Sequence, residues 1–251
     1  MFIRVIIVIV GDGMKKVIVL LSFIFLLVGC GKKSDEIIMV TEAGFAPYEF
    51  YENGEVIGVD IEISKKIADK LGKKLVIKDV AFDSIINELN SGKADFAAAG
   101  MSIDPERSEK VDFSIEYITS NQVVVVKKDS DIKSIDDIKD KRISVQLGTV
   151  ADTYVTKNYK DAKINRLKKF LVAAEDVKNN KSDCIVMDAI PANELVKSNP
   201  ELKVLDGILF QDKYGMAVKK GNKELLNSIN LVLEELIKDG KIDEYIIKFS
   251  E

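Results

Sequence analysis

The stretch "ELNSGKADFAAAG" (residues 88–100) combines the end of an amphipathic helix, a polar turn, an aspartate and a short apolar strand. The same order returns in "EDVKNNKSDCIVMD" (residues 175–188), where Asp183 stands in the place of Asp95. A repeated helix–turn–aspartate–strand unit predicts two similar α/β lobes. Ligands of open α/β sheets bind beyond the carboxyl ends of the strands, so we expect a cleft where the two lobes face each other.

Short apolar runs alternate with amphipathic segments on both sides of this stretch. The predicted strands are residues 36–41, 74–78, 94–100, 122–128, 142–146, 163–167 and 183–187. The predicted helices are residues 60–72, 82–92, 151–159, 170–180, 189–199 and 222–240, followed by a short final helix. Asp60 is the candidate N-cap of the first helix, and Gly72 lies just past its end. Continuous apolar strands separated by helices predict an α/β fold with mostly parallel sheets that are covered on both faces.

The composition excludes several classes of function. The 251 residues are 47% hydrophobic and 31% charged, which predicts a folded core. The net charge of −4 becomes −6 without the first 29 residues, and such an acidic chain is not expected to bind nucleic acid. Histidine is absent, so the commonest general base and metal ligand is missing. Cys30 and Cys184 lie in such different contexts that we expect no disulfide between them.

The N-terminal region predicts processing and a lipid anchor. "MKKVIVLLSFIFLLVGC" (residues 14–30) has a basic start, an apolar run too short for an ordinary membrane span, and a small-residue end. "LVGC" resembles the lipobox of bacterial lipoproteins, which implies a signal peptide over residues 1–29 and a lipid on Cys30; the alternative is a plain membrane anchor. Residues 30–36 are then a polar tether on the outer face of a membrane. We expect Met14 to be the true start, because the residues before it add an apolar run that a signal peptide does not need.

Arg107 lies in "AGMSIDPERSEKVDFS" (residues 99–114), just beyond a predicted buried strand. An amino acid's carboxylate is bound well by a bidentate guanidinium together with backbone N–H groups at a helix start. Arg107 is therefore a candidate carboxylate clamp, with Ser102 as a second donor. The alternative from this segment alone is a solvated arginine paired with Glu106 or Asp112.

Two further strand ends carry candidate ligand groups. "QLGT" (residues 146–149) opens a helix, so its amides and the Thr149 hydroxyl form either an anion site or a simple capping loop. Asp188 follows a strand and begins a helix; it is either an N-cap or an acceptor for a ligand's ammonium, and the two roles are compatible.

A third group of candidates gathers near the first strand. "TEAGFAPYEF" (residues 41–50) is predicted to be an exposed loop that carries Glu42 and Phe45. Phe45 and Phe82 could sandwich a ligand's side chain, with a cation–π gain if that side chain is positive. A core position is an equally good interpretation of Phe82.

Five motifs in this order resemble the polar amino-acid-binding lipoproteins of ABC importers, the bacterial extracellular solute-binding family 3. They are "GFAPYEF", "GVDIEISKKIADKLG", "AGMSIDPERSEKVDFS", "VQLGT" and "MDAIPANELV". The resemblance covers residues 37–249 and implies a two-lobed periplasmic-binding-protein (Venus-flytrap) fold with a two-strand hinge. Residues 37–119 and 214–251 would form lobe 1, and residues 120–213 would form lobe 2.

The resemblance also implies roles for individual residues. Arg107 would clamp the α-carboxylate, helped by Ser102 and Thr149. Asp188 and the backbone of Gly100 would receive the α-ammonium. The remaining predicted ligand-binding residues are Phe45 and Phe82 as aromatic walls, Glu42 facing the ligand's side chain, and Met101 and Gln146.

The chain departs from the family pattern at two of these places. The family often has aspartate where this chain has Glu42, and a small polar residue where Val150 follows Thr149. These departures bear on which amino acid is bound. Glu42 and the aromatic walls favour a basic ligand, arginine or lysine, with cystine or glutamine as the alternatives.

The predicted function is capture of a polar amino acid between the lobes and delivery to a membrane permease. No catalytic residue, metal or cofactor is expected, and the protein is expected to be a monomer. The competing interpretations are an enzyme on the same scaffold, such as a cyclohexadienyl-type dehydratase with Glu42 as its acid, or a ligand-sensing module that acts through a separate partner.

Overall fold

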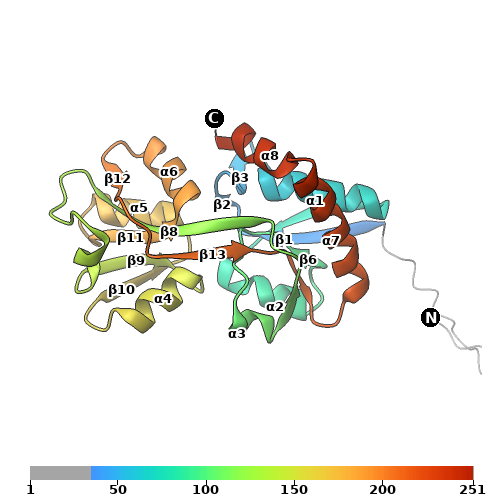
Figure 1. Cartoon of the computed structure of the whole chain (residues 1–251), viewed down its shortest axis with the longest axis horizontal. Coiled ribbons are helices and arrows are strands. Elements are labelled where there is room, and N and C mark those ends of the chain that lie inside the picture. Colours follow the sequence, from blue (N-terminus) through green and yellow to red (C-terminus); the bar gives the residue numbers. More distant parts are fainter. Residues whose placement is uncertain (1–34, 251) are drawn as a thin grey trace, which may run out of the picture. The chain divides into compact units, whose positions relative to one another are not determined.

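The computed structural model describes residues 35–250, which form two α/β lobes, each built on its own sheet (Figure 1). The predicted signal peptide, Cys30 and most of the predicted tether lie outside the described residues. Within residues 35–250, no helix has the length and apolarity needed to cross a membrane.

The first lobe has the sheet order β5-β1-β6-β14-β7. Its strands are β1 (Glu36–Thr41), β5 (Lys74–Asp79), β6 (Phe96–Ala97), β7 (Val111–Phe113) and β14 (Ala217–Lys219). Its helices are α1 (Val59–Leu71), η1 (Phe82–Ser84), α2 (Ile85–Asn90), α3 (Pro105–Ser108), α7 (Lys223–Lys238) and α8 (Lys241–Ser250). A small meander of β2 (Gly44–Phe45), β3 (Glu49–Glu52) and β4 (Glu55–Ile57) precedes α1. Strands β1, β5 and β6 pair parallel, while β14 returns antiparallel.

The second lobe has the sheet order β10-β9-β11-β8-β12. Its strands are β8 (Ile118–Lys127), β9 (Arg142–Gln146), β10 (Lys163–Leu167), β11 (Cys184–Asp188), β12 (Leu202–Val204) and β13 (Phe210–Tyr214). Its helices are η2 (Ile135–Ile138), α4 (Val150–Asn158), α5 (Phe170–Lys178) and α6 (Ala189–Ser198). Strands β9, β10 and β11 pair parallel, and β8 runs antiparallel to β11 and β12. The predicted strands 142–146 and 163–167 are confirmed.

Two antiparallel strands connect the lobes (Figure 1). Strand β8 enters the second lobe and β13 leaves it, with Ile118 paired to Tyr214 and Gln122 paired to Phe210. Beyond this crossing, residues 123–126 of β8 are four consecutive valines, all buried because the strand lies in the middle of the second sheet. The two-strand hinge is therefore part of the fold, while the domain bounds at 119/120 and 213/214 remain a prediction.

The two aspartates of the repeated unit, Asp95 and Asp183, make the same pair of backbone hydrogen bonds in their two lobes. Asp95 exchanges hydrogen bonds with the backbone of Ile38 at the start of β1: its N–H donates to the Ile38 carbonyl, and its carboxylate accepts from the Ile38 N–H at 2.7 Å. Asp183 makes the same pair of bonds with Arg142 at the start of β9, at 2.8 Å. Each aspartate thereby fixes the register of the strand that ends at the cleft.

The start of α1 differs from the prediction. The helix begins at Val59 after Gly58, and Asp60 makes no capping bond. Asp60 is instead fully buried, where it accepts hydrogen bonds from the Gly100 N–H at 2.9 Å and the Tyr117 hydroxyl at 2.7 Å. The predicted helix end is confirmed, since Gly72 adopts the left-handed conformation with φ 62°.

Candidate ligand-binding pocket

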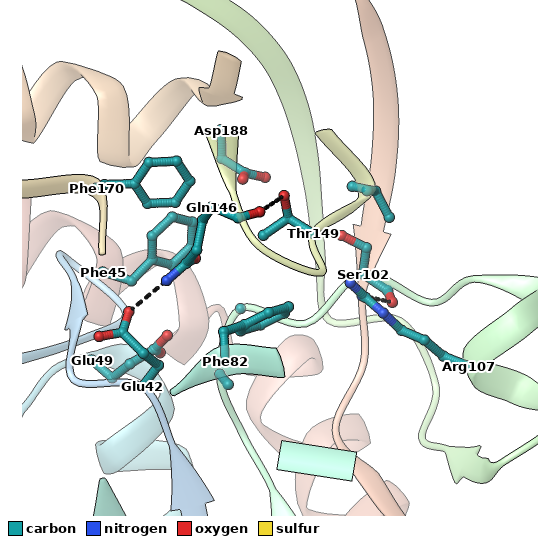
Figure 2. Close-up of a pocket in the computed structure, with 13 residues that line it drawn as sticks. Glu42, Phe45, Glu49, Phe82, Ser102, Arg107, Gln146, Thr149, Phe170 and Asp188 are labelled. Atoms are coloured by element: carbon teal, nitrogen blue, oxygen red, sulfur yellow. Dashed lines mark hydrogen bonds between the residues drawn. The ribbon is translucent and has the colours of Figure 1, made fainter. Parts of the chain in front are cut away.

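A pocket between the lobes gathers nine of the ten predicted ligand-binding residues (Figure 2). Its lining consists of Glu42, Phe45, Glu49, Phe82, Ala99, Gly100, Ser102, Arg107, Gln146, Thr149, Val150, Phe170 and Asp188. In the first lobe they lie in the loops and short elements that follow β1, β5 and β6, and in the second lobe they lie at the ends of β9 and β11 and the starts of α4 and α5. The free volume is only about 20 Å³, enough for a water molecule, so the lobes are closed on each other.

Arg107 is placed by a short capped helix. Asp104 is the N-cap of α3 and accepts hydrogen bonds from the N–H groups of Glu106 and Arg107. The Arg107 side chain is buried, with 7% of its surface exposed, and its guanidinium lies 5.3 Å from the centre of the Phe82 ring. Burial lowers the pKa of this guanidinium, but an arginine remains charged in a protein. The alternative of a solvated surface arginine is wrong.

The Arg107 guanidinium bonds to carbonyls of both lobes. It donates to the Ser102 carbonyl at 2.7 Å in its own lobe and to the Gly148 carbonyl at 2.9 Å in the other. A guanidinium presents five N–H donors, and these bonds use two. Arg107 can therefore still offer a fork of donors to a carboxylate.

Thr149 and Ser102 lie near this end of the pocket in Figure 2. Thr149 caps α4: its hydroxyl donates to the Gln146 carbonyl at 2.8 Å and accepts from the Asp152 N–H at 3.3 Å. The capping interpretation is confirmed, and capping leaves the start of α4 facing the pocket. The Ser102 hydroxyl donates to Asp212 of the hinge strand β13.

Asp188 is placed by the second lobe and the hinge. It stands before α6, yet its carboxylate makes no capping bond. It accepts instead from the Ser120 hydroxyl at 2.6 Å and the Tyr214 hydroxyl at 2.5 Å. Burial raises the pKa of Asp188, and the two hydroxyl groups act in the opposite direction. The carboxylate is thus held on the pocket wall by the crossing strands.

Gly100 and Ser102 line the pocket, but Met101 between them does not. The Met101 side chain lies in the first-lobe core with 1% of its surface exposed. The Met101 side chain therefore does not line this pocket, and the role of Met101 in ligand binding remains a prediction. At Gly100, φ is +50° and an added Cβ would lie 2.7 Å from the Phe45 ring, so the position requires glycine.

Glu42 marks the opposite end of the pocket from Arg107 (Figure 2). It is 2% exposed, and Gln146 of the second lobe donates to its Oε2 at 3.0 Å. Lys169, also of the second lobe, lies 3.2 Å from its Oε1. Burial raises the pKa of Glu42, although the bonds from Gln146 and Lys169 both lower it.

Glu49 also lines the pocket and was missed in the sequence. It is 1% exposed, and neither of its carboxyl oxygens meets a donor among the described residues. Its neighbour is the carboxyl of Asp60, to which only a protonated Glu49 can donate. Burial raises the pKa of Glu49 well above its usual range. Glu49 begins β3, and its place in "APYEF", a few residues after Glu42, was the available signal.

Phe170 is another lining residue that was not predicted from the sequence. It begins α5 in the second lobe, and its ring stacks on Phe45 with centroids 5.7 Å apart and planes at 27°. Phe45 and Phe82 line the pocket as predicted, so three aromatic rings from two lobes surround it. The signal for Phe170 was its position three residues after the strand "KINRL", which ends at the same sheet edge as Gln146.

The profile of the family described as bacterial extracellular solute-binding proteins, family 3, matches residues 37–251. The arginine-binding extracellular protein ArtP of Bacillus subtilis (strain 168) is 31% identical over 251 residues, covering 92% of this chain and 96% of the relative. ABC transporter arginine-binding protein 1 of Escherichia coli (strain K12) is 33% identical, covering 82% and 87%.

A solved ancestral arginine-binding protein bound to arginine superposes with a TM-score of 0.81 at 42% identity, covering 86% of this chain and 98% of that one. The same TM-score and identity hold for an ancestral arginine-binding protein bound to glutamine. The fold, the pocket between the lobes and these relatives agree, and the chain belongs to the bacterial extracellular solute-binding proteins of family 3.

Proposed function

We propose that this protein is the ligand receptor of an amino-acid ABC importer, which closes its two lobes around a basic L-amino acid and presents it to a membrane permease. The observation that carries the proposal is the polarity of one closed pocket: a buried guanidinium at one end and buried carboxyls at the other. An amino acid with a cationic side chain has the complementary arrangement.

The backbone groups of the ligand match the Arg107 end. Arg107, with Ser102 and Thr149, would bind the α-carboxylate through charge-assisted hydrogen bonds. Asp188 and the Gly100 carbonyl would accept from the α-ammonium. These groups belong to both lobes, so a bound ligand makes contacts in the closed form that an open form cannot offer, and binding shifts the equilibrium toward closure.

The side chain of the ligand would lie among the aromatic rings and end at Glu42. Glu42, the carboxylate at this end of the pocket that accepts a hydrogen bond from Gln146, disfavours an acidic side chain and favours a positive one. A flat guanidinium also gains from the faces of Phe45 and Phe82. Arginine is therefore the first expected ligand, followed by lysine, with glutamine and cystine behind them. The arginine-binding names of the relatives support this order.

We further propose that the chain acts as a monomeric binding protein on the outer face of the membrane, anchored through a lipid on Cys30 after removal of the signal peptide. The basis of the lipid anchor is the N-terminal sequence alone, in which a basic start and an apolar run lead to "LVGC". A role in binding instead of catalysis is supported by the relatives, which are named as binding proteins.

The proposal is tested by calorimetric titration of the protein from Lys33 onward, which contains the whole compact unit Ser34–Glu251. The protein is refolded to strip bound ligand and titrated with arginine, lysine, glutamine, cystine and glutamate. We expect arginine to bind with a Kd of about 1 μM or lower, which is roughly −8 kcal/mol. Silence across the panel would overturn the proposed function. Tight glutamate binding with none of arginine or lysine would overturn the preference for a basic ligand.

A further inference from the structure

One ion pair between the lobes involves a residue to which neither the sequence nor the family resemblance gave a role. The ammonium of Lys169 lies 3.2 Å from Oε1 of Glu42. Glu42 belongs to the loop after β1 in the first lobe, and Lys169 is the N-cap residue of α5 in the second. The neighbouring Phe170 stacks on Phe45, so this corner of α5 packs directly against the first lobe.

The two partners are buried to very different degrees. The Glu42 side chain is 2% exposed, whereas the Lys169 side chain is 44% exposed. Gln146 holds the other oxygen of Glu42 at 3.0 Å and is itself fixed by the Lys168 carbonyl at 2.9 Å. Glu42 is thus a fixed acceptor, while Lys169 reaches it from solvent and can swing back at little cost.

The Lys169 ammonium lies at the place where the cationic group of a basic ligand would bind, beside the Glu42 carboxylate. Glu42 is the carboxylate that would receive the cationic end of the ligand's side chain, and in the closed protein the Lys169 ammonium already stands at ion-pair distance from its Oε1. With a free volume of about 20 Å³, the pocket cannot admit an arginine side chain unless groups around it move.

We propose that Lys169 is a specificity-determining residue that acts as an internal occupant of the cation subsite at Glu42. The inference rests on the proposed function. A basic ligand must displace the Lys169 ammonium from Glu42. The free energy that it gains there is only the difference between its own contact with Glu42 and the Lys169–Glu42 contact that is lost. A ligand with a neutral side chain, such as glutamine, can leave the Lys169–Glu42 pair in place. Lys169 therefore weakens arginine binding and narrows the discrimination between arginine and glutamine.

The test is the substitution Lys169→Met, which keeps the length of the side chain and removes its charge. Lys163→Met is the matched control: Lys163 is exposed at the start of β10, and its loss changes the net charge of the same lobe equally. Wild type and both variants, all from Lys33 onward, are titrated with L-arginine and L-glutamine. Melting temperatures establish that both variants fold.

We expect Lys169→Met to bind arginine at least about fivefold more tightly than wild type, because the ligand no longer has to break a partly exposed ion pair that competes for Glu42. Glutamine binding should change by less than about twofold, and Lys163→Met should match wild type for both ligands. Unchanged or weaker arginine binding by Lys169→Met, with wild type binding arginine, would overturn the inference and leave the proposed function standing. Failure of wild type to bind either ligand would overturn the proposed function, and the inference with it.

Discussion

Replacing Arg107 with methionine tests the carboxylate clamp most directly. Methionine fills much of the same space but has no N–H donor and no charge. The substitution removes the guanidinium that now donates to the carbonyls of Ser102 and Gly148 at 2.7 and 2.9 Å. It leaves the opposite end of the pocket, at Glu42, unchanged.

The expected loss follows from the number of bonds. A bidentate guanidinium–carboxylate contact has two charge-assisted hydrogen bonds, each contributing roughly 1.5–3 kcal/mol. These values are already net of solvation, and two bonds near the lower end of the range predict that arginine binding weakens by about 3–4 kcal/mol, or two to three orders of magnitude in Kd. Arg107→Lys keeps the charge but not the planar fork, and should fall between wild type and Arg107→Met.

A ligand without a carboxylate separates binding from folding effects. Agmatine is arginine without its α-carboxylate, so it should bind wild type weakly and lose little more in Arg107→Met. This comparison forms a double-mutant cycle between protein and ligand, measured by calorimetry, with a melting temperature to establish folding. If Arg107→Met folds and binds arginine within about threefold of wild type, the clamp assignment is wrong. Equal losses for arginine and agmatine would also refute it, since the effect would then be structural.

Three further outcomes follow from the geometry. Asp188→Asn should weaken arginine binding by about 2 kcal/mol or more, because the α-ammonium loses a carboxylate partner. Calorimetry should show the same loss of binding free energy for lysine, which has the same α-ammonium. Gly100→Ala should lower the free energy of unfolding by about 1–3 kcal/mol in urea, because φ is +50° and the added methyl would meet Phe45 at 2.7 Å. Burial raises the pKa of Asp60 to about 6 from 3.8, so its contribution to stability is present below pH 3.8 and is lost as the pH rises to about 6. Wild type should therefore lose up to roughly 3 kcal/mol over that window relative to Asp60→Asn, in urea titrations at each pH.

The repeated unit was readable in the sequence because its signals are local. Asp95 and Asp183 stand directly before short apolar strands, and both bond to the backbone at the start of a neighbouring parallel strand. The carboxyl ends of parallel strands share one edge, so residues that follow such strands were expected to meet there. Nine of the ten predicted ligand-binding residues line the pocket, although their roles remain predictions.

Three features of the structure were not predicted from the sequence: the direction of one side chain, the start of one helix and one contact between the lobes. The Met101 side chain lies in the first-lobe core, while the flanking Gly100 and Ser102 line the pocket. Asp60 is a good N-cap residue by type, but the helix starts one residue earlier and the carboxylate is needed by Gly100 and Tyr117. Lys169 is separated from Glu42 by more than a hundred residues, and no local pattern distinguishes it from other surface lysines.

The groups that hold the lobes together are the same groups that would bind the ligand. Arg107 bonds to the Gly148 carbonyl, while Gln146 and Lys169 both bond to Glu42. An incoming amino acid that takes Arg107 and Glu42 for itself must break some of these contacts before it makes its own. Ligand affinity is then a difference between two sets of bonds, and it can be strengthened by weakening the protein's own closure. This arrangement predicts that a variant lacking one interlobe contact can bind arginine more tightly than wild type. A simple sum of the ligand's contacts does not predict that result.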